Sequence, residues 1–547
     1  MLLSRRLRYV FLIVLWVGML AGLSYRLVIL TGQERSFLQN QSHARVNRTH
    51  TIPSKRGRIL DRQGTVLAMS EPKWSLWVEP KTLHNDSELI SKTAELMGMS
   101  KDGLESMVDR HQEKSFMYLK RRCSQALIEK ALSHQELPIH TIEDYDRYYP
   151  GGDSTAPLLG QVDIDGKGIE GVELMEDGRL SGARGFKKVV INRYGETVQN
   201  VSESAPKHGQ DLVLTIDKNI QYHAFKALKK GVEEAGAKSG MAVVLDVDSG
   251  GVLAAVNYPS FDPGSHDVMS EFRKNRAFVN LQEPGSTFKP MSMSYVLEHK
   301  DGKDLKEVDT SPGVWVLNRQ RVTDVRNYGI ISVDDILMRS SNIGIAKLVL
   351  DISADFVGWL EKTYPIGKRS LESYPGEPRG RVNHPDEKKL FDKASISYGY
   401  GISMTVLQQA QAYLTIANGG FKQDVKLVLD SSQSKYNKSE RLLSKATVDR
   451  VKSMMRKVVS NTGTGRLGQV KGLEVAGKTG TTHMYTSEGY AKDRYIASFS
   501  GFAPLDNPKY VICIVVEEPN KSRHYGGQVA APIFSEILFQ MLYLDAK

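Results

Sequence analysis

The stretch PGSTFKP, residues 284–290, places Ser286 and Lys289 three positions apart, directly after a Pro-Gly pair. Side chains at this spacing share one face of a helix, so the lysine would lie one turn beyond the serine. Pro290 is tolerated only near the beginning of a helix, which places Ser286 at a helix start. The same Ser-x-x-Lys spacing also occurs at Ser70/Lys73, Ser204/Lys207 and Ser432/Lys435, so the spacing alone does not identify a catalytic serine.

Two further short motifs follow in the same part of the chain. Ser340-Ser341-Asn342 lies between two helical stretches, and Lys478-Thr479-Gly480-Thr481 stands just before the last predicted strands. A Lys-Thr-Gly triplet is expected about 0.2 times by chance in a chain of this length. Any one of these residues alone would most simply be structural. The ordered set Ser-x-x-Lys, Ser-x-Asn, Lys-Thr-Gly instead indicates a single catalytic site.

The residue types in this set suit nucleophilic catalysis. A serine hydroxyl is a weak nucleophile that needs an adjacent base, and Lys289 could serve if it is neutral before the attack. Burial, together with a second cation such as Lys478, would lower the pKa of Lys289 in this way. Because a helix N-terminus favours negative charge, the backbone N–H of Ser286 is a natural donor to an oxyanion.

Hydrophobic patterns around the motifs predict an α+β domain over residues 211–547. A strand over 212–216 leads to Asp217 as the N-cap of a long amphipathic helix. Paired strands are predicted on either side of DSGG (residues 248–251) and of PLDNP (504–508), and an amphipathic helix ends the chain. This order predicts an antiparallel sheet flanked by helices.

Residues 31–210 have a different texture and offer no catalytic cluster. KRGRILDRQGTVLAMS (55–70) predicts a strand, a turn and a returning strand, and SELISKTAELMGM (87–99) has the apolar spacing of a short helix. We therefore expect an elongated, non-catalytic α+β pedestal domain here.

The first thirty residues predict a membrane anchor. The apolar run from Tyr9 to Tyr25, extended by LVIL, is long enough to approach the width of a bilayer core. Arginines precede it, which predicts a cytoplasmic tail over 1–8, a transmembrane helix over 9–30 and an external remainder. A cleaved signal peptide is the alternative, but no convincing cleavage site is visible.

The charge and cysteine patterns limit the other classes of function. Residues 1–62 hold eleven Lys or Arg and two acidic residues, so this segment carries nearly all of the formal net charge of +10. A basic terminus beside an apolar run indicates membrane topology rather than nucleic-acid binding. The two cysteines and the histidines show no zinc-site spacing, so we expect no metal and no cofactor.

The ordered motifs resemble those of the penicillin-recognising serine transferases. RGRILDRQG, YYPGG…LLGQV and GIEGVE are similar to motifs of the non-catalytic domain of class B penicillin-binding proteins, and SYGYGISMTVLQ and HYGGQVAAPIF resemble their catalytic domain. The resemblance covers nearly the whole chain, and SSNIG with KTGT looks most like the cell-division branch, of the penicillin-binding protein 3 type. Val406, where the family usually has proline, and Thr482 depart from the pattern.

The resemblance also implies roles for the motif residues. Ser340 would relay a proton to the leaving amine, and Asn342 would hold the substrate amide and Lys289. Lys478, Thr479 and Thr481 would bind a terminal carboxylate, and the backbone N–H of Thr481 would join that of Ser286 in the oxyanion hole. Gly480 would leave room for the substrate backbone to lie flat.

The function that these features imply is a single-pass, membrane-anchored D,D-transpeptidase of the bacterial inner membrane, with a periplasmic catalytic domain, acting at the division septum. It would cross-link peptidoglycan stem peptides on glycan strands derived from lipid-linked precursors, through an acyl-serine intermediate that β-lactams imitate. The implied partners are a polytopic division glycosyltransferase and other division proteins.

Several alternatives remain open from the sequence. An elongation-type transpeptidase shares the same motifs. A membrane-anchored β-lactamase would share the serine, although the Glu-x-x-Leu-Asn segment of class A enzymes is not found between the second and third motifs. A non-enzymatic β-lactam receptor or division scaffold would keep the fold without turnover. A bifunctional protein would need a glycosyltransferase domain, for which residues 31–210 offer no candidate.

Overall fold

The computed structural model describes residues 5–37, 47–84, 86–114, 116–191, 197–264, 270–300, 305–386, 389–429, 440–486 and 489–545. The chain forms two compact units, and the segments that build them alternate along the sequence. The first unit comprises residues 1–55, 72–145 and 182–209, and the second comprises residues 56–71, 146–181 and 210–547. Residues 1–4 of the predicted cytoplasmic tail lie outside the described residues.

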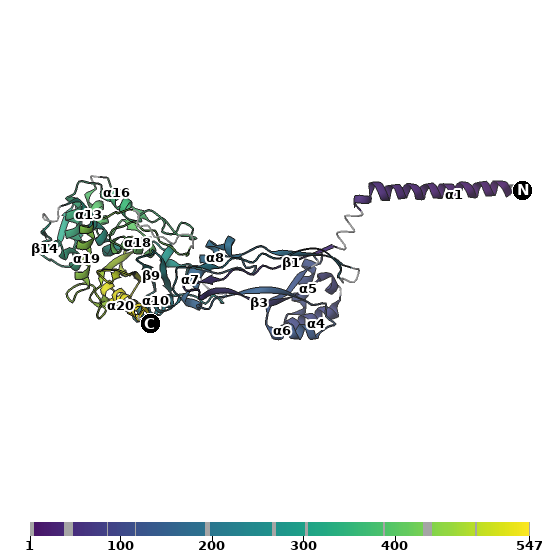
Figure 1. Cartoon of the computed structure of the whole chain (residues 1–547), viewed down its shortest axis with the longest axis horizontal. Coiled ribbons are helices and arrows are strands. Elements are labelled where there is room, and N and C mark those ends of the chain that lie inside the picture. The colour runs from purple at the N-terminus through teal and green to yellow at the C-terminus, as the bar shows by residue number, and fades with distance from the viewer. Residues whose placement is uncertain are drawn as a thin grey trace. The chain divides into compact units, whose positions relative to one another are not determined.

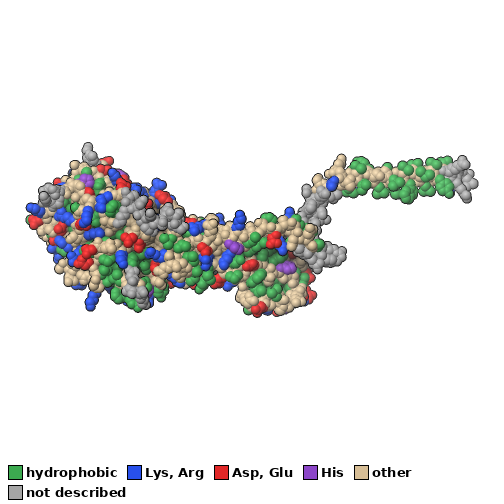
Figure 2. Space-filling model, viewed as in Figure 1, with side chains coloured by type: hydrophobic (Ala, Val, Ile, Leu, Met, Phe, Trp, Pro, Cys, Tyr) green, Lys and Arg blue, Asp and Glu red, His purple; other side chains and the backbone are tan. Residues whose placement is uncertain are grey.

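The N-terminal apolar run forms one continuous helix, as predicted. Helix α1 (Arg5–Val28) continues into a wider turn, η1 (Ile29–Gln33). The helical stretch Leu7–Gln33 has 27 residues, a mean hydropathy of 2.0 and no buried part, so its length and composition suffice to cross a membrane. Figure 2 shows hydrophobic side chains along this helix. At its end Arg26 pairs with Glu34, with 3.2 Å between the guanidinium and carboxylate atoms.

The remainder of the first unit is a small α+β core. The predicted helix at residue 87 is present, with the Asp86 side chain accepting from the backbone N–H groups of Glu88 and Leu89. The unit's helices are α3 (Pro80–Leu83), α4 (Ser87–Met97), α5 (Lys101–His111) and α6 (Gln125–Ser133). Its strands are the end of β3 (Val66–Val78), β4 (Met117–Cys123), most of β5 (His140–Tyr148), and the three-stranded sheet of β1 (Asn47–Ile52), β6 (Gly185–Ile191) and β7 (Thr197–Ser204).

The second unit is built on a sheet of five strands, which is antiparallel, as predicted. The two predicted hairpins supply four of the strands, and the Lys-Thr-Gly motif lies on the fifth, at one edge. In spatial order the strands are β10 (Val252–Tyr258), β9 (Ser239–Asp246), β19 (Tyr510–Glu517), β18 (Gly489–Ala503) and β17 (Ala476–Thr486). Strand β9 of this sheet is labelled in Figure 1.

Helices cover both faces of this sheet. On one face α10 (Lys218–Glu234) and α20 (Gly526–Asp545) pack against alternate strand residues such as Val244 and Ile514. On the other face α13 (Lys289–His299), α18 (Val406–Ala417) and α19 (Lys445–Val459) cover the intervening residues, such as Val243 and Cys513. Successive residues of a central strand thus pack into the hydrophobic cores on opposite faces of the sheet. Because both faces are covered, the central strands are apolar throughout.

Shorter elements complete the second unit. The strand predicted over 212–216 is confined to β8 (Leu212–Val213), which pairs in parallel with β2 (Ile59–Leu60), while Asp217 caps α10 as predicted. The helices are α7 (Ala156–Leu159), α8 (Gly171–Met175), α9 (Asp177–Leu180), α11 (Ser270–Arg273), α12 (Arg276–Val279), α14 (Asp335–Arg339), α15 (Asn342–Leu350), α16 (Phe356–Thr363) and α17 (Leu390–Ser397). The strands are β11 (Glu307–Asp309), β12 (Val314–Leu317), β13 (Gln320–Thr323), β14 (Ile330–Ser332), β15 (Arg381–Val382) and β16 (Ile402–Ser403).

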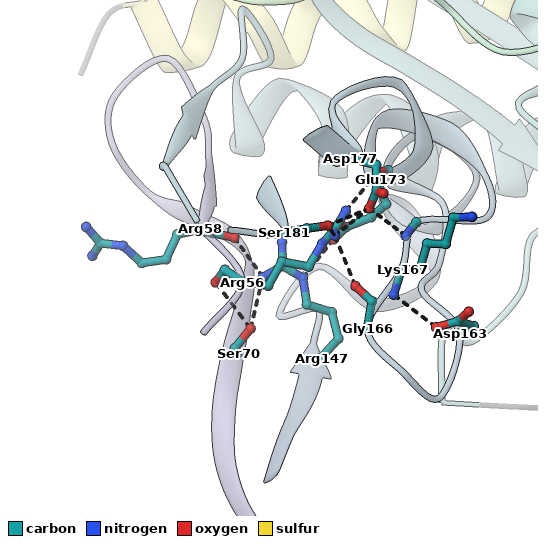
Figure 3. A network of polar contacts seen from close by, with 12 residues as sticks. Arg56, Arg58, Ser70, Arg147, Asp163, Gly166, Lys167, Glu173, Asp177 and Ser181 are labelled. Atoms are coloured by element: carbon teal, nitrogen blue, oxygen red, sulfur yellow. Dashed lines mark hydrogen bonds and ion pairs between the residues drawn. The ribbon is translucent and has the colours of Figure 1, made fainter. Parts of the chain in front are cut away.

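A buried ion-pair network joins the early segments of the second unit (Figure 3). Glu173 is fully buried and accepts from Arg56 at 2.6 Å and from Arg147 at 2.7 Å, one guanidinium on each carboxylate oxygen. Arg56 also donates to Asp177 at 2.7 Å, and Arg147 donates to the carbonyl of Gly57 at 2.8 Å. The motifs RGRILDRQG and GIEGVE therefore meet at one carboxylate, and this contact is part of the structure of the second unit.

Removal of the Glu173 carboxylate should lower the stability of the fold. In Glu173→Ala, Arg56 and Arg147 lose a shared buried partner, and we expect the free energy of unfolding to fall by about 3–5 kcal/mol. Chemical denaturation of the full chain in detergent measures this. The control is Asp449→Ala, whose pair with Lys445 joins side chains that are 57% and 81% exposed and should contribute nothing measurable. Equal midpoints for the two variants would contradict the prediction.

Candidate active site

The first motif lies on a tight turn rather than on the first turn of an α-helix. Gly285–Phe288 forms a 3-10 helix, and α13 begins only at Lys289, with Pro290 in its first turn. In a 3-10 turn, side chains three apart are nearly eclipsed, so Lys289 lies directly beside Ser286. Its Nζ lies within hydrogen-bonding distance of the Ser286 Oγ, at 2.9 Å. The predicted contact is present, on a slightly different backbone from the one expected.

Buried side chains of neighbouring elements hold this turn in place. Thr287 donates to the carbonyl of Pro284 at 2.6 Å, and its own carbonyl accepts from the Tyr413 hydroxyl of α18 at 2.6 Å. The amide of Gln409 donates to Thr287 Oγ1 at 3.1 Å and to Ser500 of β18 at 2.6 Å. The turn that carries Ser286 is therefore fixed to both a helix and the central sheet.

The second motif encloses the amine of Lys289. Ser340 ends α14 with the left-handed angles φ 58° and ψ 38°, and Asn342 begins α15. Lys289 Nζ donates to the Ser340 carbonyl at 2.6 Å, to Ser340 Oγ at 3.2 Å and to Asn342 Oδ1 at 2.7 Å. The left-handed backbone at Ser340 lets one residue present both its carbonyl and its hydroxyl to the same amine.

The third motif brings a second lysine to the same serine. Lys478 on the edge strand β17 donates to Ser340 Oγ at 2.9 Å and to the carbonyl of Thr479 at 2.9 Å. The Thr479 hydroxyl lies 2.9 Å from that of Thr464, and Thr481 Oγ1 accepts from the backbone N–H of Gly526 at 3.0 Å. The structure thus joins Ser286, Lys289, Ser340, Asn342 and Lys478 in one chain of hydrogen bonds.

Burial changes the acid–base properties of both amines. Lys289 and Lys478 are each 0% exposed. Burial lowers the pKa of Lys289 to about 7, against the opposing charge of Asp324. Burial also lowers the pKa of Lys478 well below its ordinary value, and the nearby charge of Lys289 lowers it further. Lys289 can therefore be neutral near neutral pH, as a base for Ser286 requires.

Ser286 opens onto a pocket of about 820 Å³. The predicted residues Ser340, Asn342, Thr479 and Thr481 also line it, whereas both lysines lie behind this lining. Apart from Thr482, sequence reasoning did not single out the other lining residues, which include Asp324, Tyr328, Arg339, Tyr400, Thr464 and Tyr525. For Tyr400 and Tyr525 a signal existed, because both stand in the segments SYGYGISMTVLQ and HYGGQVAAPIF.

The two departures from the expected pattern have simple structural settings. Val406 is the first residue of α18, where proline would also fit, and Thr405 forms a capping box with Gln408. Thr482 lines the pocket, and its methyl group lies against Gly285, where an added Cβ would come within 2.1 Å of it. The substitution at Val406 therefore affects a helix start, and Thr482 is in contact with the turn that carries Ser286.

Gly480 also allows a close contact within the fold, in addition to the role expected for it toward the substrate. A Cβ at this position would lie 2.3 Å from Ser498 Oγ, 3.0 Å from a Thr287 methyl carbon and 3.3 Å from the Pro284 carbonyl oxygen. These atoms belong to the neighbouring strand and to the turn that carries Ser286, not to the open pocket. The missing side chain thus allows β17 to approach that turn closely.

A methyl group at Gly480 should disturb this packing. We expect Gly480→Ala to lower the free energy of unfolding by about 1–3 kcal/mol, because the close contacts must be relieved by movement of the backbone. Thermal denaturation of the full chain in detergent checks this. Gly178→Ala is the matched control, since a Cβ there meets nothing within 4 Å. An unchanged midpoint for Gly480→Ala would contradict the close approach.

Among the described residues, no group of three or more His, Cys, Asp or Glu side chains is arranged to hold a metal ion. The hydrogen-bonded chain of two serines, two lysines and an asparagine can supply a nucleophile, a base and a route for protons without one.

Comparisons with known proteins agree with this arrangement. Residues 240–539 match the penicillin binding protein transpeptidase domain, and residues 51–214 match the penicillin-binding protein dimerisation domain. A probable peptidoglycan D,D-transpeptidase, PbpC, of Pseudomonas aeruginosa is 33% identical over 98% of this chain and 95% of its own length. The peptidoglycan D,D-transpeptidase FtsI of Escherichia coli K12 is 30% identical over 92% of this chain and 85% of its own length.

Solved structures show the same relationship. Penicillin binding protein 3 from Mycobacterium tuberculosis, solved in complex with aztreonam, has a TM-score of 0.66 at 25% identity, covering 91% of this chain and 97% of that one. The transpeptidase domain of penicillin-binding protein 3 from Burkholderia pseudomallei has a TM-score of 0.55 at 34% identity, covering 60% of this chain and 96% of that one. The chain therefore belongs to the penicillin-binding protein transpeptidase family, in its form with an N-terminal dimerisation domain.

Proposed function

We propose that this protein is a peptidoglycan D,D-transpeptidase of the penicillin-binding protein 3 type, with Ser286 as its nucleophile. The observation that carries this proposal is the 2.9 Å hydrogen bond between Lys289 Nζ and Ser286 Oγ, at a buried amine whose pKa is lowered to about 7. A serine beside such an amine can be deprotonated as it attacks a carbonyl carbon.

In the acylation step Ser286 attacks the carbonyl carbon between the two terminal D-alanines of a stem peptide. The hydroxyl proton passes to Lys289, and the negative oxygen of the intermediate lies against the backbone N–H groups of Ser286 and Thr481. When the C–N bond breaks, the departing amine takes a proton from Ser340, which draws one from Lys478 or Lys289. The contacts that both lysines make with Ser340 Oγ support this relay.

The remaining motif residues would bind the substrate. Asn342, Thr479 and Thr481 line the pocket and offer the amide and hydroxyl groups that a peptide backbone and a terminal carboxylate require. Lys478 lies behind them, so its contribution to carboxylate binding would be electrostatic. An amine of a second stem peptide then attacks the acyl-serine and forms the cross-link. β-Lactams would acylate Ser286 in the same way, because they imitate the acyl-D-Ala-D-Ala end.

The cellular setting extends this proposal. Helix α1 would anchor the protein in the inner membrane with residues 1–8 in the cytoplasm, residues 31–210 as a pedestal and residues 211–547 as the periplasmic catalytic domain. Action at the division septum beside a polytopic glycosyltransferase is supported by the similarity to relatives named FtsI. An elongation role remains the alternative, and the same similarity makes it the weaker one.

Ser286→Ala tests the nucleophile directly. The full chain in detergent is incubated with a penicillin, and its intact mass is measured over time. We expect one stable penicilloyl adduct on the wild type and none on Ser286→Ala, because the new bond is an ester to the serine oxygen. Rapid loss of the adduct with hydrolysis of the drug would instead indicate a β-lactamase. Absence of an adduct on the folded wild type would refute both readings.

The rate of acylation should depend on pH through Lys289. Since the base must be neutral and its pKa is about 7, the second-order rate constant should rise about tenfold per pH unit below that value and level off above it. Acylation by a fluorescent penicillin, followed from about pH 5.5 to about pH 9, measures the profile. A flat profile across this range would show that Lys289 does not titrate in the reaction.

A further inference from the structure

Asp324 binds the start of the helix that carries the second motif. It follows β13, and its Oδ1 accepts from the backbone N–H groups of Asn342 at 2.5 Å and Ile343 at 3.1 Å. Its Oδ2 accepts from the hydroxyl of Ser341 at 2.5 Å. A carboxylate at the N-terminus of α15 is also favoured by the helix dipole. Asp324 therefore fixes the backbone at Asn342.

The residue before it fixes the side chain of Asn342. The carbonyl of Thr323 accepts from Asn342 Nδ2 at 2.9 Å. Because the amide nitrogen is engaged there, the amide oxygen points the other way, toward Lys289 Nζ at 2.7 Å. The pair Thr323 and Asp324 thus determines which end of the amide faces the catalytic amine.

The charges around Lys289 are unbalanced without Asp324. Lys478 from β17 adds a second buried amine, while Ser286, Ser340 and Asn342 bring no charge. Asp324 is the carboxylate whose charge opposes the effect of burial on Lys289. Tyr328 lines the same pocket as Asp324, and Arg326 and Arg339 lie over its ring, with 5.3 and 5.5 Å from each guanidinium carbon to the ring centroid.

We propose that Asp324 is a positioning residue that fixes the backbone of Asn342, whose amide oxygen faces Lys289, and that it supplies the negative charge that stabilises a proton on this amine. The inference rests on the proposed function and deepens it. In acylation the Ser286 hydroxyl proton moves to Lys289 Nζ as the oxygen bonds to the carbonyl carbon. The ammonium that forms is buried, and the nearby carboxylate offsets part of the loss of hydration.

The test separates the effect of the negative charge at position 324 from the effect of the side chain's shape. The full chain in detergent reacts with a fluorescent penicillin from about pH 5.5 to about pH 9, as wild type, Asp324→Asn, Asp324→Glu and Ser341→Ala. In Asp324→Asn the acid limb of the profile should move about one unit to lower pH, and the plateau should fall about tenfold, because the amine becomes a weaker base. Asp324→Glu and Ser341→Ala keep the charge and should keep the wild-type limb, even if their plateaus fall.

The outcomes separate this inference from the function on which it rests. A wild type that forms no adduct would overturn the proposed function, and this inference with it. An acylated wild type whose acid limb coincides with that of Asp324→Asn would overturn the inference alone. So would an equal shift in Asp324→Asn and Asp324→Glu, since the effect would then be one of shape. If thermal denaturation shows that Asp324→Asn does not fold, Asp324→Glu decides, and a displaced acid limb in that variant would overturn the inference.

Discussion

Two lysine amines share one serine hydroxyl in the interior of the second unit, and the arrangement around them depends on this contact. Ser340 Oγ accepts from Lys289 at 3.2 Å and from Lys478 at 2.9 Å, and neither lysine is exposed. Burying two like charges this close is unfavourable, so the site holds its amines through acceptors instead: two carbonyls, an amide oxygen and two hydroxyls. Each of the three motifs contributes some of these amines and acceptors to the site.

The fold serves this requirement by joining elements that are distant in the sequence. β17 carries Lys478 at the edge of the sheet, α13 carries Lys289 beneath it, and the α14–α15 junction closes the gap. Gly480 has no side chain, which allows the strand and the turn of Ser286 to touch, and Gln409 ties that turn to β18. The same contacts therefore pack the core and position the catalytic side chains.

Local patterns predicted much of this structure. The paired strands around residues 248–251 and 504–508, the cap at Asp217 and the final helix follow from alternation, periodicity and turn chemistry, which act over a few residues. Contacts between distant segments leave no such trace. Asp324 meets α15 across 17 to 19 positions, and Arg56 meets Glu173 across 117. The 3-10 turn at Ser286 was also missed, because an α-helical start and a 3-10 turn have the same sequence signals.

The left-handed backbone of Ser340 has a consequence for how such a sequence can change. At φ 58° a serine is held in a conformation that glycine adopts more easily, so folding alone would accept glycine there. Glycine would keep the carbonyl that faces Lys289 and lose the hydroxyl that both lysines share. Selection for stability and selection for turnover thus oppose each other at this one position. Glycine at position 340 would therefore ease the backbone turn and interrupt the hydrogen-bonded connection between the two lysines.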